Sequence, residues 1–435
     1  MFGFKHLRNA LFRAKFIFLS KRLIHLAKIS FIQESGDNFY FCPDLKTVLI
    51  VGSGPAGLMA AYQLARRGYQ THVFDHKKSF SRKLLVAGKG GFNLTHGEEL
   101  NSFLRKYNDS KIQDAIRLFS NDDFRTFLME MGVETYVGSS GRVFPIKGIT
   151  PAELVTKWKQ SIIDLGGQFH AEHRLEEIQG ASMIFETEKG RVKMVGDYLV
   201  LALGGASWSV TGSDGSWTGM IERMGIKVIP FASSNGGIVL DSEFLDKNSS
   251  GKALKNVAVF ASDVYRKGDL VFTEYGLEGT PVYALNGAVR ENKELCLDLK
   301  PDLSESQIKF RWNSELQPTD QLRALKLSKE AISLLKRTLT REEFLNVDVL
   351  ISQIKRIPLP VQGLRNIEEV ISTVGGVAMD EVNSSFRIKK LKNAYAIGEM
   401  LDWDTCTGGY LIQASVSTGF VAAEAIINAD QSLED

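Results

Sequence analysis

The chain has 435 residues, of which 44% are hydrophobic and 24% charged, and its formal net charge is +2 at pH 7. These values are ordinary for a globular protein long enough for two domains, and the charge gives no general attraction to nucleic acid. The three cysteines, Cys42, Cys296 and Cys406, are far apart and form no C-x-x-C pair. This spacing argues against a disulfide framework, a zinc site or a dithiol redox couple, and it fits a reducing compartment such as the cytoplasm.

The first 28 residues carry seven Lys and Arg side chains, and the first acidic residue is Glu34. The apolar runs here are too short to span a bilayer, and a secretory signal is not recognisable. Three interpretations remain: a basic helix lying on an anionic membrane, an organelle transit peptide, or an extension outside the folded unit. We favour an extension over residues 1–45, because the pattern of a globular domain begins abruptly near Lys46. No segment elsewhere looks transmembrane.

Residues 46–75, KTVLIVGSGPAGLMAAYQLARRGYQTHVFD, predict a strand, a glycine-rich turn, a helix and a second strand. The apolar run VLIV is typical of a parallel strand buried on both faces, and G-x-G-x-x-G follows it directly. Apolar residues then recur at helical spacing, and Gly68 ends the helix. This order of parts is the fingerprint of a dinucleotide-binding unit.

Each part of the fingerprint has a physical role. Gly52 permits the tight turn, Gly54 lets the backbone approach a pyrophosphate, and Gly57 lets the helix pack closely on the strand. The helix N-terminus offers free N–H groups and a positive dipole to phosphates, and Asp75 is placed to accept hydrogen bonds from ribose hydroxyls. The first alternative is an ordinary βαβ unit with a glycine-rich turn, but such a unit would not need Asp75. The second is a nucleotide with a 2′-phosphate, which the basic residues after Asp75 would suit. The predicted cofactor-binding residues are Gly52, Gly54, Pro55, Ala56, Gly57 and Asp75, and the alternative basic residues are His76, Lys77 and Lys78.

The segment SRKLLVAGKGGFNLTH, residues 81–96, reads as a loop that folds over a cofactor. Its basic residues are placed to meet phosphates or the pyrimidine edge of a flavin, and its glycines allow a close approach to a ring. His96 is a candidate general acid or base, although a lone histidine on a loop is more often a surface residue. The predicted cofactor-binding residues are Arg82, Lys83, Gly88, Gly91 and Asn93, and the pocket candidates are Lys89, Asn93 and His96.

Helices are predicted over 99–107, 110–119, 122–131 and 151–165. Alternating segments at 168–178, 182–188 and 191–196 predict antiparallel strands. The apolar run in DYLVLALGGASW, residues 197–208, predicts another buried strand. Taken alone it fits any core strand, but its glycine turn also suits a strand that passes beneath a cofactor, and we place Ala202 and Gly204 in the cofactor site.

The stretch AIGEMLDWDTCTGGYLIQA, residues 396–414, predicts a strand that ends in a glycine and an acid, then a glycine pair that opens a helix. The Glu399 carboxylate is placed to accept hydrogen bonds from ribityl hydroxyls. Bare glycines let a flat ring lie against the backbone, and the helix dipole faces the flavin N1/O2 edge, which favours the reduced anion. A glycine-rich cap of a plain helix is the alternative. With the fingerprint, this stretch indicates FAD, held by Gly398, Glu399, Gly408, Gly409 and Tyr410.

The same stretch supplies further candidates for chemistry. We expect Asp402 and Tyr410, together with His96, to be the catalytic residues, and Trp403 to lie in the pocket. Asp402 would alternatively only brace the loop, and Trp403 only cover the ring. Cys406 reads better as a small packing residue than as a nucleophile.

These segments predict an α/β fold in which an FAD-binding Rossmann-type domain with a parallel central sheet is interrupted by an insertion. The predicted parts are 46–215 and 372–430 for the FAD-binding domain and 216–371 for the insertion, whose first half is β-rich and whose second half is helical, including 320–336 and 341–345. The insertion has no second G-x-G-x-x-G after a strand, so stable binding of a pyridine nucleotide in a second Rossmann domain is not expected.

Together these motifs resemble the BaiN-like or aminoacetone-oxidase family of bacterial FAD-binding enzymes, within the glutathione-reductase-type FAD superfamily. The resemblance covers roughly residues 46–428 and rests on SRKLLVAGKGGFNLTH, GRVFP, LALGGASW with TGSDGSW, STVGGV and GEMLDWDTCTGGYLIQA. The tail motif most resembles a largely uncharacterised subgroup. Many relatives have a cysteine before NLT, where this chain has Phe92, so no thiol role is carried over there. The resemblance implies bound FAD and a redox reaction with loosely defined substrates.

The expected function is therefore an FAD-dependent oxidoreductase that transfers hydride between the flavin and a small organic substrate. Its active site would lie between the FAD domain and the insertion, with NAD(P)H as a transient donor or the substrate itself as the electron source. The alternatives are an oxygen-using oxidase of small amines and a non-catalytic FAD-binding redox protein. We expect no nucleic-acid partner, no metal, and membrane association only through the basic N-terminus.

Overall fold

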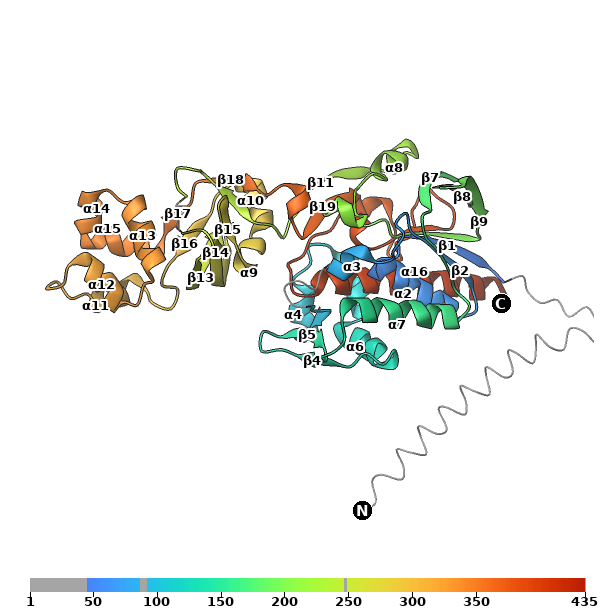
Figure 1. The fold of residues 1–435 in the computed structure, drawn as a ribbon, viewed down its shortest axis with the longest axis horizontal. Coiled ribbons are helices and arrows are strands. Elements are labelled where there is room, and N and C mark those ends of the chain that lie inside the picture. Colours follow the sequence, from blue (N-terminus) through green and yellow to red (C-terminus); the bar gives the residue numbers. More distant parts are fainter. Residues whose placement is uncertain (1–44, 87–91, 246–248, 435) are drawn as a thin grey trace, which may run out of the picture. The chain divides into compact units, whose positions relative to one another are not determined.

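The computed structural model describes residues 45–86, 92–245 and 249–434 (Figure 1). The expected roles of the basic extension, and of Gly88, Lys89 and Gly91, therefore lie outside the described residues.

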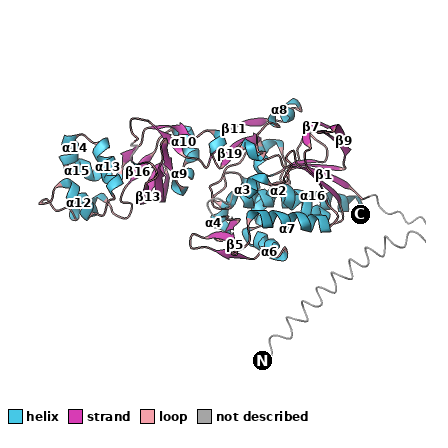
Figure 2. Cartoon of the chain, in the orientation of Figure 1, coloured by secondary structure: helices cyan, strands magenta, loops and turns pink. Residues whose placement is uncertain are grey.

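A five-stranded parallel sheet with the order β20-β10-β1-β2-β6 forms the centre of the first domain (Figure 2). Numbered along the chain, these strands lie in the order 5-4-1-2-3, which is the order of a Rossmann fold. The predicted α/β fold with a parallel sheet is confirmed. The strands are β1 (Thr47–Val51), β2 (Gln70–Phe74), β6 (Gln168–His170), β10 (Tyr198–Leu201) and β20 (Ala394–Ala396).

Two helices, α2 (Pro55–Ala65) and α16 (Tyr410–Glu434), pack against each other in the core of this domain. They approach so closely that a Cβ on Gly419 would lie 2.3 Å from the carbonyl oxygen of Ala56. The sequence analysis singled out no membrane span, but α16 is long and apolar enough for one, and 67% of its apolar window is buried inside the structure. That burial is typical of the core helix of a globular domain.

The predicted helices between the first strands and β6 are present with slightly shorter bounds. Side chains of Glu99, Asp109, Ser120 and Thr150 cap the starts of α4, α5, α6 and α7 by accepting hydrogen bonds from free N–H groups. The remaining elements are α3 (Arg82–Val86), β3 (Thr95–His96), α4 (Leu100–Leu104), α5 (Ser110–Leu118), α6 (Asn121–Glu130), β4 (Thr135–Val137), β5 (Arg142–Pro145), α7 (Pro151–Asp164), β7 (Arg174–Gln179), β8 (Ser182–Thr187), β9 (Gly190–Val195) and α8 (Thr218–Arg223).

One strand assignment was wrong. The segment 168–178 is not a single antiparallel strand, because Gln168–His170 pairs in parallel with β2 as an edge of the main sheet. Only Arg174–Gln179 joins the antiparallel sheet β7-β8-β9. Three residues are too few to show the apolar pattern of a parallel strand.

The insertion is built on a seven-stranded sheet with the order β17-β16-β13-β14-β15-β12-β18. The expected helical segment 320–336 is divided between α12 and α13. The elements are β11 (Val228–Ser234), β12 (Ile238–Leu240), β13 (Ala253–Ala261), β14 (Val264–Phe272), β15 (Gly276–Glu278), α9 (Thr280–Tyr283), α10 (Asn286–Asn292), β16 (Cys296–Asp298), α11 (Glu305–Phe310), α12 (Pro318–Ala324), α13 (Lys329–Thr338), α14 (Arg341–Leu345), α15 (Val347–Lys355), β17 (Ile357–Pro358), β18 (Val361–Leu364) and β19 (Ser372–Val377).

Two separate hydrophobic cores mark the two parts of the chain. One contains the parallel sheet with α2 and α16, and the other lies within residues 238–359. Trp217, Met220 and Ile221, which the sequence analysis assigned to the insertion, belong to the first core. The antiparallel pair of β11 and β19 connects the two parts.

Candidate cofactor and substrate site

A cavity of about 410 Å³ lies at the carboxyl edge of the parallel sheet. Segments that follow all five strands line it: 51–56 after β1, 75–76 after β2, 173–176 after β6, 202–204 after β10 and 397–399 after β20. In a Rossmann sheet the ligand crevice lies at this edge, where the strand order reverses between the first and fourth strands. Those strands are β1 and β10 here. The cavity therefore occupies the place where this fold binds a dinucleotide.

The fingerprint glycines lie where β1 leads into α2. Gly52 has a φ of +106°, and a Cβ there would lie 2.0 Å from the carbonyl oxygen of Ala202, so the turn requires glycine. A Cβ on Gly57 would lie 2.0 Å from the Gly52 carbonyl oxygen, so this glycine allows the close packing of helix on strand. Gly54 differs, because apart from its chain neighbours no atom of the described residues lies within 4 Å of its Cβ position, and the residue lines the cavity.

Asp75 follows β2 and lines the same cavity. Its carboxylate accepts hydrogen bonds from the N–H groups of Ser53 (3.3 Å) and Lys77 (2.9 Å), and from the Ser53 hydroxyl. Ser53 is fixed in turn by the N–H of Ser81, which donates to its Oγ at 2.8 Å. The carboxylate is thus held beside the glycine turn. Ser53 was not singled out from the sequence, although it lies between the first two glycines.

Lys83 and Glu399 meet across the cavity although they are 316 positions apart in the chain. The Lys83 ammonium donates to both carboxylate oxygens of Glu399, at 3.0 and 2.9 Å, and to the Ser207 hydroxyl at 2.9 Å. The sequence analysis placed both residues at the cofactor but did not foresee the ion pair. The pair joins the loop after β2 to the segment after β20.

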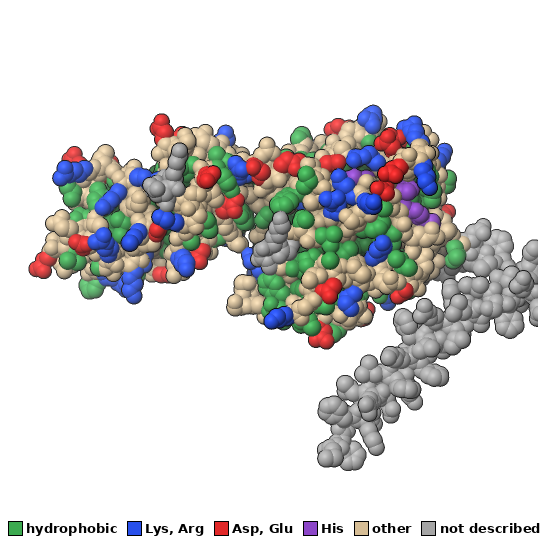
Figure 3. Space-filling model, in the orientation of Figure 1, with side chains coloured by type: hydrophobic (Ala, Val, Ile, Leu, Met, Phe, Trp, Pro, Cys, Tyr) green, Lys and Arg blue, Asp and Glu red, His purple; other side chains and the backbone are tan. Residues whose placement is uncertain are grey.

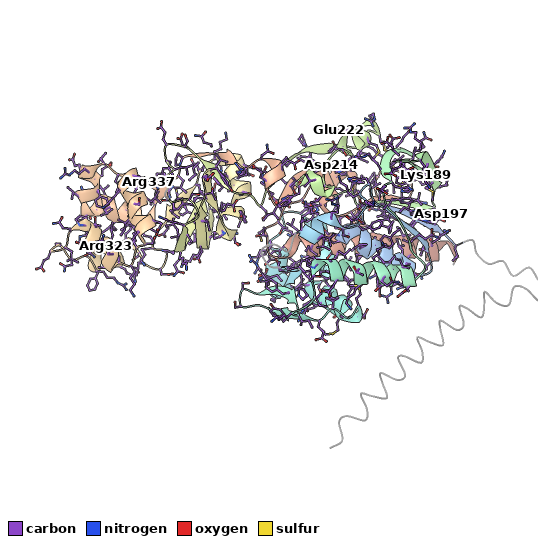
Figure 4. The ribbon with its side chains drawn as sticks, viewed as in Figure 1. Lys189, Asp197, Asp214, Glu222, Arg323 and Arg337 are labelled. Carbon is purple, nitrogen blue, oxygen red and sulfur yellow. The ribbon has the colours of Figure 1, made fainter. Side chains whose placement is uncertain are left out.

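Two buried polar atoms that line the cavity have no partner within the described residues: Nε2 of His76 and Oγ of Ser213. An unpaired buried polar group costs about 1–3 kcal/mol, so both atoms favour a polar ligand. Burial, as the largest cause, lowers the pKa of His76, so its ring is neutral near pH 7. Arg174 and Arg223 add positive charge to the cavity lining, and Asp214, labelled in Figure 4, adds a carboxylate to it.

These features fit the adenosine and pyrophosphate parts of FAD. The glycine turn leaves space for phosphates, the helix start and the cations attract them, and the unpaired atoms provide further hydrogen bonds. The described residues contain no group of three or more His, Cys, Asp or Glu side chains that could hold a metal ion. The predicted cofactor-binding residues that line the cavity are Gly52, Gly54, Pro55, Ala56, Asp75, Arg82, Lys83, Ala202, Gly204, Gly398 and Glu399.

The second glycine stretch is packed against protein. Gly408 and Gly409 have φ values of +121° and +98° and directly precede α16. A Cβ on Gly409 would lie 2.5 Å from the Cα of Thr95, so this glycine allows the β3 backbone to approach the helix start. Neither glycine lines the cavity. The backbone of Thr95 thus occupies the close position at Gly409 that the sequence analysis assigned to a flat ring.

His96 and Tyr410, two of the predicted catalytic residues, lie together. Their rings stack with centroids 5.4 Å apart. His96 Nε2 lies 3.1 Å from the Ser140 carbonyl oxygen and its Nδ1 lies 3.2 Å from the Glu98 N–H, so a neutral ring satisfies both contacts. Both ring nitrogens are therefore engaged by the backbone in this arrangement.

The Tyr410 hydroxyl donates a hydrogen bond to the Glu98 carboxylate. The Tyr410 carbonyl oxygen accepts a hydrogen bond from the Tyr107 hydroxyl at 2.8 Å. Burial, reinforced by the hydrogen bond to Glu98, holds the pKa of Tyr410 well above its ordinary value. Tyr410 is thus a protonated donor near pH 7. It does not line the cavity.

Asp402 is apart from this pair. Its Oδ1 accepts from the Gly375 N–H at 3.0 Å, and burial, with the nearby charges of Asp109 and Asp404, raises its pKa. A raised pKa is the direction that a general acid requires, and the contact with Gly375 fits a bracing role.

The neighbours of Asp402 have structural contacts. Trp403 is 2% exposed and donates from Nε1 to the Gly398 carbonyl oxygen at 2.9 Å, so it braces the turn before Glu399. Burial raises the pKa of Cys406, which keeps the thiol protonated and fits a packing residue. Asn93 has a buried Nδ2 without a partner among the described residues, but it does not line the cavity.

Sequence reasoning missed two arginines where the parallel-sheet domain meets the insertion. Arg290 of α10 forms an ion pair with Asp404 at 2.7 Å and donates to the Ser233 carbonyl oxygen at 2.7 Å. Arg142 of β5 donates to the Thr280 hydroxyl of α9 at 3.2 Å. The only signal for Arg142 was its place in the GRVFP motif, and we find none for Arg290.

Curated relatives match nearly their whole length. A ribosomal RNA dihydrouridine synthase of Haemophilus influenzae is 24% identical over 400 residues, which cover 87% of this chain and 98% of that protein. A 3-dehydro-bile acid delta(4,6)-reductase of Clostridium scindens is 23% identical over 412 residues, covering 86% and 98%. Among solved structures, a 3-ketosteroid-delta4-(5alpha)-dehydrogenase of Rhodococcus jostii is 12% identical with a TM-score of 0.48, covering 91% of this chain and 98% of that one.

The family match is more extensive than any single motif. Residues 46–425 match the family described as HI0933-like protein Rossmann domain. This range begins at the first residue of the dinucleotide fingerprint and ends within α16, the helix that completes the core. The match also confirms the resemblance to BaiN-like enzymes and FAD as the cofactor. The chain belongs to the HI0933-like family of FAD-dependent oxidoreductases with a Rossmann domain.

Proposed function

We propose that this enzyme reduces a carbon–carbon double bond conjugated to a carbonyl group in a small organic substrate, with NAD(P)H as a transient electron donor. The observation that carries the proposal is the single cavity in which the fingerprint turn and the segment after β20 converge. The fingerprint turn would bind the adenosine and pyrophosphate end of a flavin cofactor, and the segment after β20 would bind its ribityl end. Hydride exchange with a substrate is the chemistry that a bound flavin supplies.

The residues of this chain would divide the work of holding FAD. Gly54 and the start of α2 would accommodate the pyrophosphate, and Asp75 the adenosine ribose. The Lys83–Glu399 pair, at 2.9 Å, would lie along the ribityl chain, where Glu399 accepts hydrogen bonds from hydroxyls and Lys83 limits its charge. Tyr410, which is protonated near pH 7, and Asp402, whose pKa is raised by burial, are the candidates for supplying a proton to the reduced product.

The names of two relatives support the choice of reaction. A delta(4,6)-reductase of a 3-dehydro bile acid and a synthase of dihydrouridine both, by name, saturate a double bond in conjugation with a carbonyl. Both act on anionic molecules. The insertion, which has a core of its own, would shape the substrate side.

The test begins with purified full-length protein. The released cofactor is identified by absorbance and chromatography, and FAD is expected in near-stoichiometric amount. The protein is then mixed without oxygen with NADPH or NADH, and bleaching of the flavin is followed before and after addition of 2-cyclohexenone. Faster reoxidation by the enone than by buffer is expected. Protein that folds but cannot retain added FAD would contradict the proposal.

Two alternative functions give different results in the same experiment. An amine oxidase would consume oxygen in an electrode with small amines and would not respond to the enone. A non-catalytic redox protein would hold FAD that neither pyridine nucleotides nor amines reduce at a useful rate. Either result would replace the proposed reaction while leaving the family assignment intact.

A further inference from the structure

Arg142 places a positive charge beside the start of α16, outside the lining of the cofactor cavity. In the antiparallel pair of β3 and β5, Arg142 is opposite His96, so the two side chains leave the same face of the ladder. A Cβ on Gly408 would lie 3.7 Å from the Arg142 Nε. The guanidinium thus borders the residues that open α16 and the Tyr410 ring.

The same side chain also reaches the insertion. Its Nη2 donates to the Thr280 hydroxyl, at the first residue of α9, at 3.2 Å. Arg142 therefore touches both parts of the molecule where the predicted substrate would lie. Because a guanidinium has five N–H donors, this one contact leaves most of its hydrogen-bonding capacity unused.

Arg142 has no acidic partner among the residues that the structure describes. Within the described residues, no carboxylate oxygen lies within 4.0 Å of its nitrogen atoms, although the side chain is half-buried. The nearby acids are engaged elsewhere: Glu98 with Tyr410, and Asp404 with Arg290 at 2.7 Å. A half-buried cation without a counter-ion attracts an anion more strongly than an exposed one.

Two more cations add to the positive potential here. Burial raises the pKa of the Cys406 thiol, and the charges of Lys106 and Arg266 act in the opposite direction, which places both near that thiol. Lys106 precedes α5 in the parallel-sheet domain, whereas Arg266 belongs to β14 of the insertion. Neither forms an ion pair within the part of the chain that the structure describes. Cations from both parts of the molecule therefore lie near Cys406, four residues before α16 begins.

We propose that Arg142 binds a carboxylate or phosphate oxygen of the substrate between the parallel-sheet domain and the insertion, so that the enzyme selects acidic substrates. The inference rests on the proposed function, because it assigns the class of substrate for the proposed reaction. Arg290, in contrast, is committed to Asp404 and serves to join the two parts. A bidentate contact from the free edge of the Arg142 guanidinium is the geometry expected for such an anion.

The test measures anion binding directly. FAD-loaded protein at constant ionic strength is titrated by calorimetry with inorganic phosphate and, separately, with glutarate as a carboxylate probe. The two arms distinguish a phosphate site from a carboxylate site. Binding of at least one probe is expected, with affinity reduced at least tenfold in Arg142→Met and less in Arg142→Lys, which keeps the charge. Arg105→Met, at an exposed arginine that bonds only Ser102 among the described residues, serves as the control and should bind like the wild type.

The outcomes separate this inference from the proposed function. Absence of binding by both probes to the wild type, or equal binding by wild type and Arg142→Met, would overturn the anion site. Thermal melts identify a variant that has not folded, and Arg142→Lys then supplies the comparison. The visible spectrum of each sample reports FAD, so protein that holds FAD but ignores both anions contradicts only the inference. Protein that never holds FAD contradicts the proposed function.

Discussion

The two glycine-rich stretches look alike in sequence but differ in what they make room for. At Gly54 no protein atom lies within 4 Å of the Cβ position, and the residue borders the cavity. At Gly409 the Cβ position lies 2.5 Å from the Thr95 Cα, and the residue is away from the cavity lining. One glycine leaves space for a ligand and the other for the chain itself. Substitutions at the two positions should therefore harm different properties.

Gly409→Ala should have the largest effect, and on folding. The new methyl group would overlap the Thr95 backbone, and a φ of +98° strains any residue with a side chain. We expect the free energy of unfolding to fall by about 3–4 kcal/mol. Urea unfolding of FAD-depleted protein measures it, with Gly363→Ala, whose Cβ position is open, as the control. A variant as stable as the wild type but unable to hold FAD would mean that Gly409 faces the cofactor instead.

Gly54→Val should spare the fold and remove the cofactor. Its backbone, with φ −66° and ψ 177°, suits any residue, and the valine side chain would project into open space. We expect FAD affinity to fall about 100-fold, or about 2.7 kcal/mol, because the branched side chain blocks the approach of the pyrophosphate. FAD fluorescence titration gives the affinity, and apoprotein melting shows whether folding is intact. Gly54→Ala should lie between this variant and the wild type. Unchanged affinity in Gly54→Val would place the phosphates elsewhere.

Glu399→Ala should have a smaller effect, which tests the far end of the cavity. Loss of the carboxylate removes the proposed acceptor for ribityl hydroxyls, and we expect about a tenfold weaker FAD affinity with the fold retained. Removal of Glu399 also breaks its ion pair with Lys83, so the loss of affinity has two causes. Lys83→Met and the double variant complete a double-mutant cycle that separates them. If Glu399 served only to pair with Lys83, the double variant would bind FAD as weakly as either single variant. FAD affinity equal to the wild type in Glu399→Ala would refute the ribityl assignment.

The smallest expected effect is a pH dependence of the free energy of unfolding, which arises from histidines on β2 and β6. His72 Nδ1 lies 3.0 Å from His170 Nε2, and burial, with the charges of His72 and His173, lowers the pKa of His170 to about 4. Figure 3 shows histidine side chains grouped on the surface of this domain. The unfolded chain takes up a proton near pH 6.5 that the folded chain refuses, so stability falls as the pH drops from about 6.5 toward 4.

We expect this titration to cost about 1 kcal/mol, because partial exposure of the ring weakens the effect. Urea unfolding of the apoprotein at pH 7.5 and pH 5 measures the loss, and His170→Gln should show a smaller one. An equal loss in both proteins would assign the pH dependence to other groups.

Much of the fold was predictable because its signals are local. The first strand, the glycine turn and α2 follow one another within 46–75, where strand and helix periodicity are both visible. Gln168–His170 was misassigned because three residues at a sheet edge carry no periodicity.

The site was less predictable because its decisive contacts are distant in the chain. Nothing near Gly409 in the sequence shows that Thr95 occupies the space beside it. The Lys83–Glu399 pair and the contact of Arg142 with Thr280 likewise depend on the folded topology. Sequence reasoning therefore named residues correctly placed at the cavity, but it could not say which glycine faces a ligand and which faces protein.

The place of β20 and α16 at the end of the chain has a consequence for biosynthesis. The insertion, with its own core within residues 238–359, leaves the ribosome before Ala394–Ala396 can complete the parallel sheet. Domains emerge and fold in order during translation, so the insertion can fold while the parallel-sheet domain still lacks β20 and α16. Capture of the coenzyme is therefore a late event in the life of the nascent chain, because the segment that carries Glu399 is among the last to be synthesised.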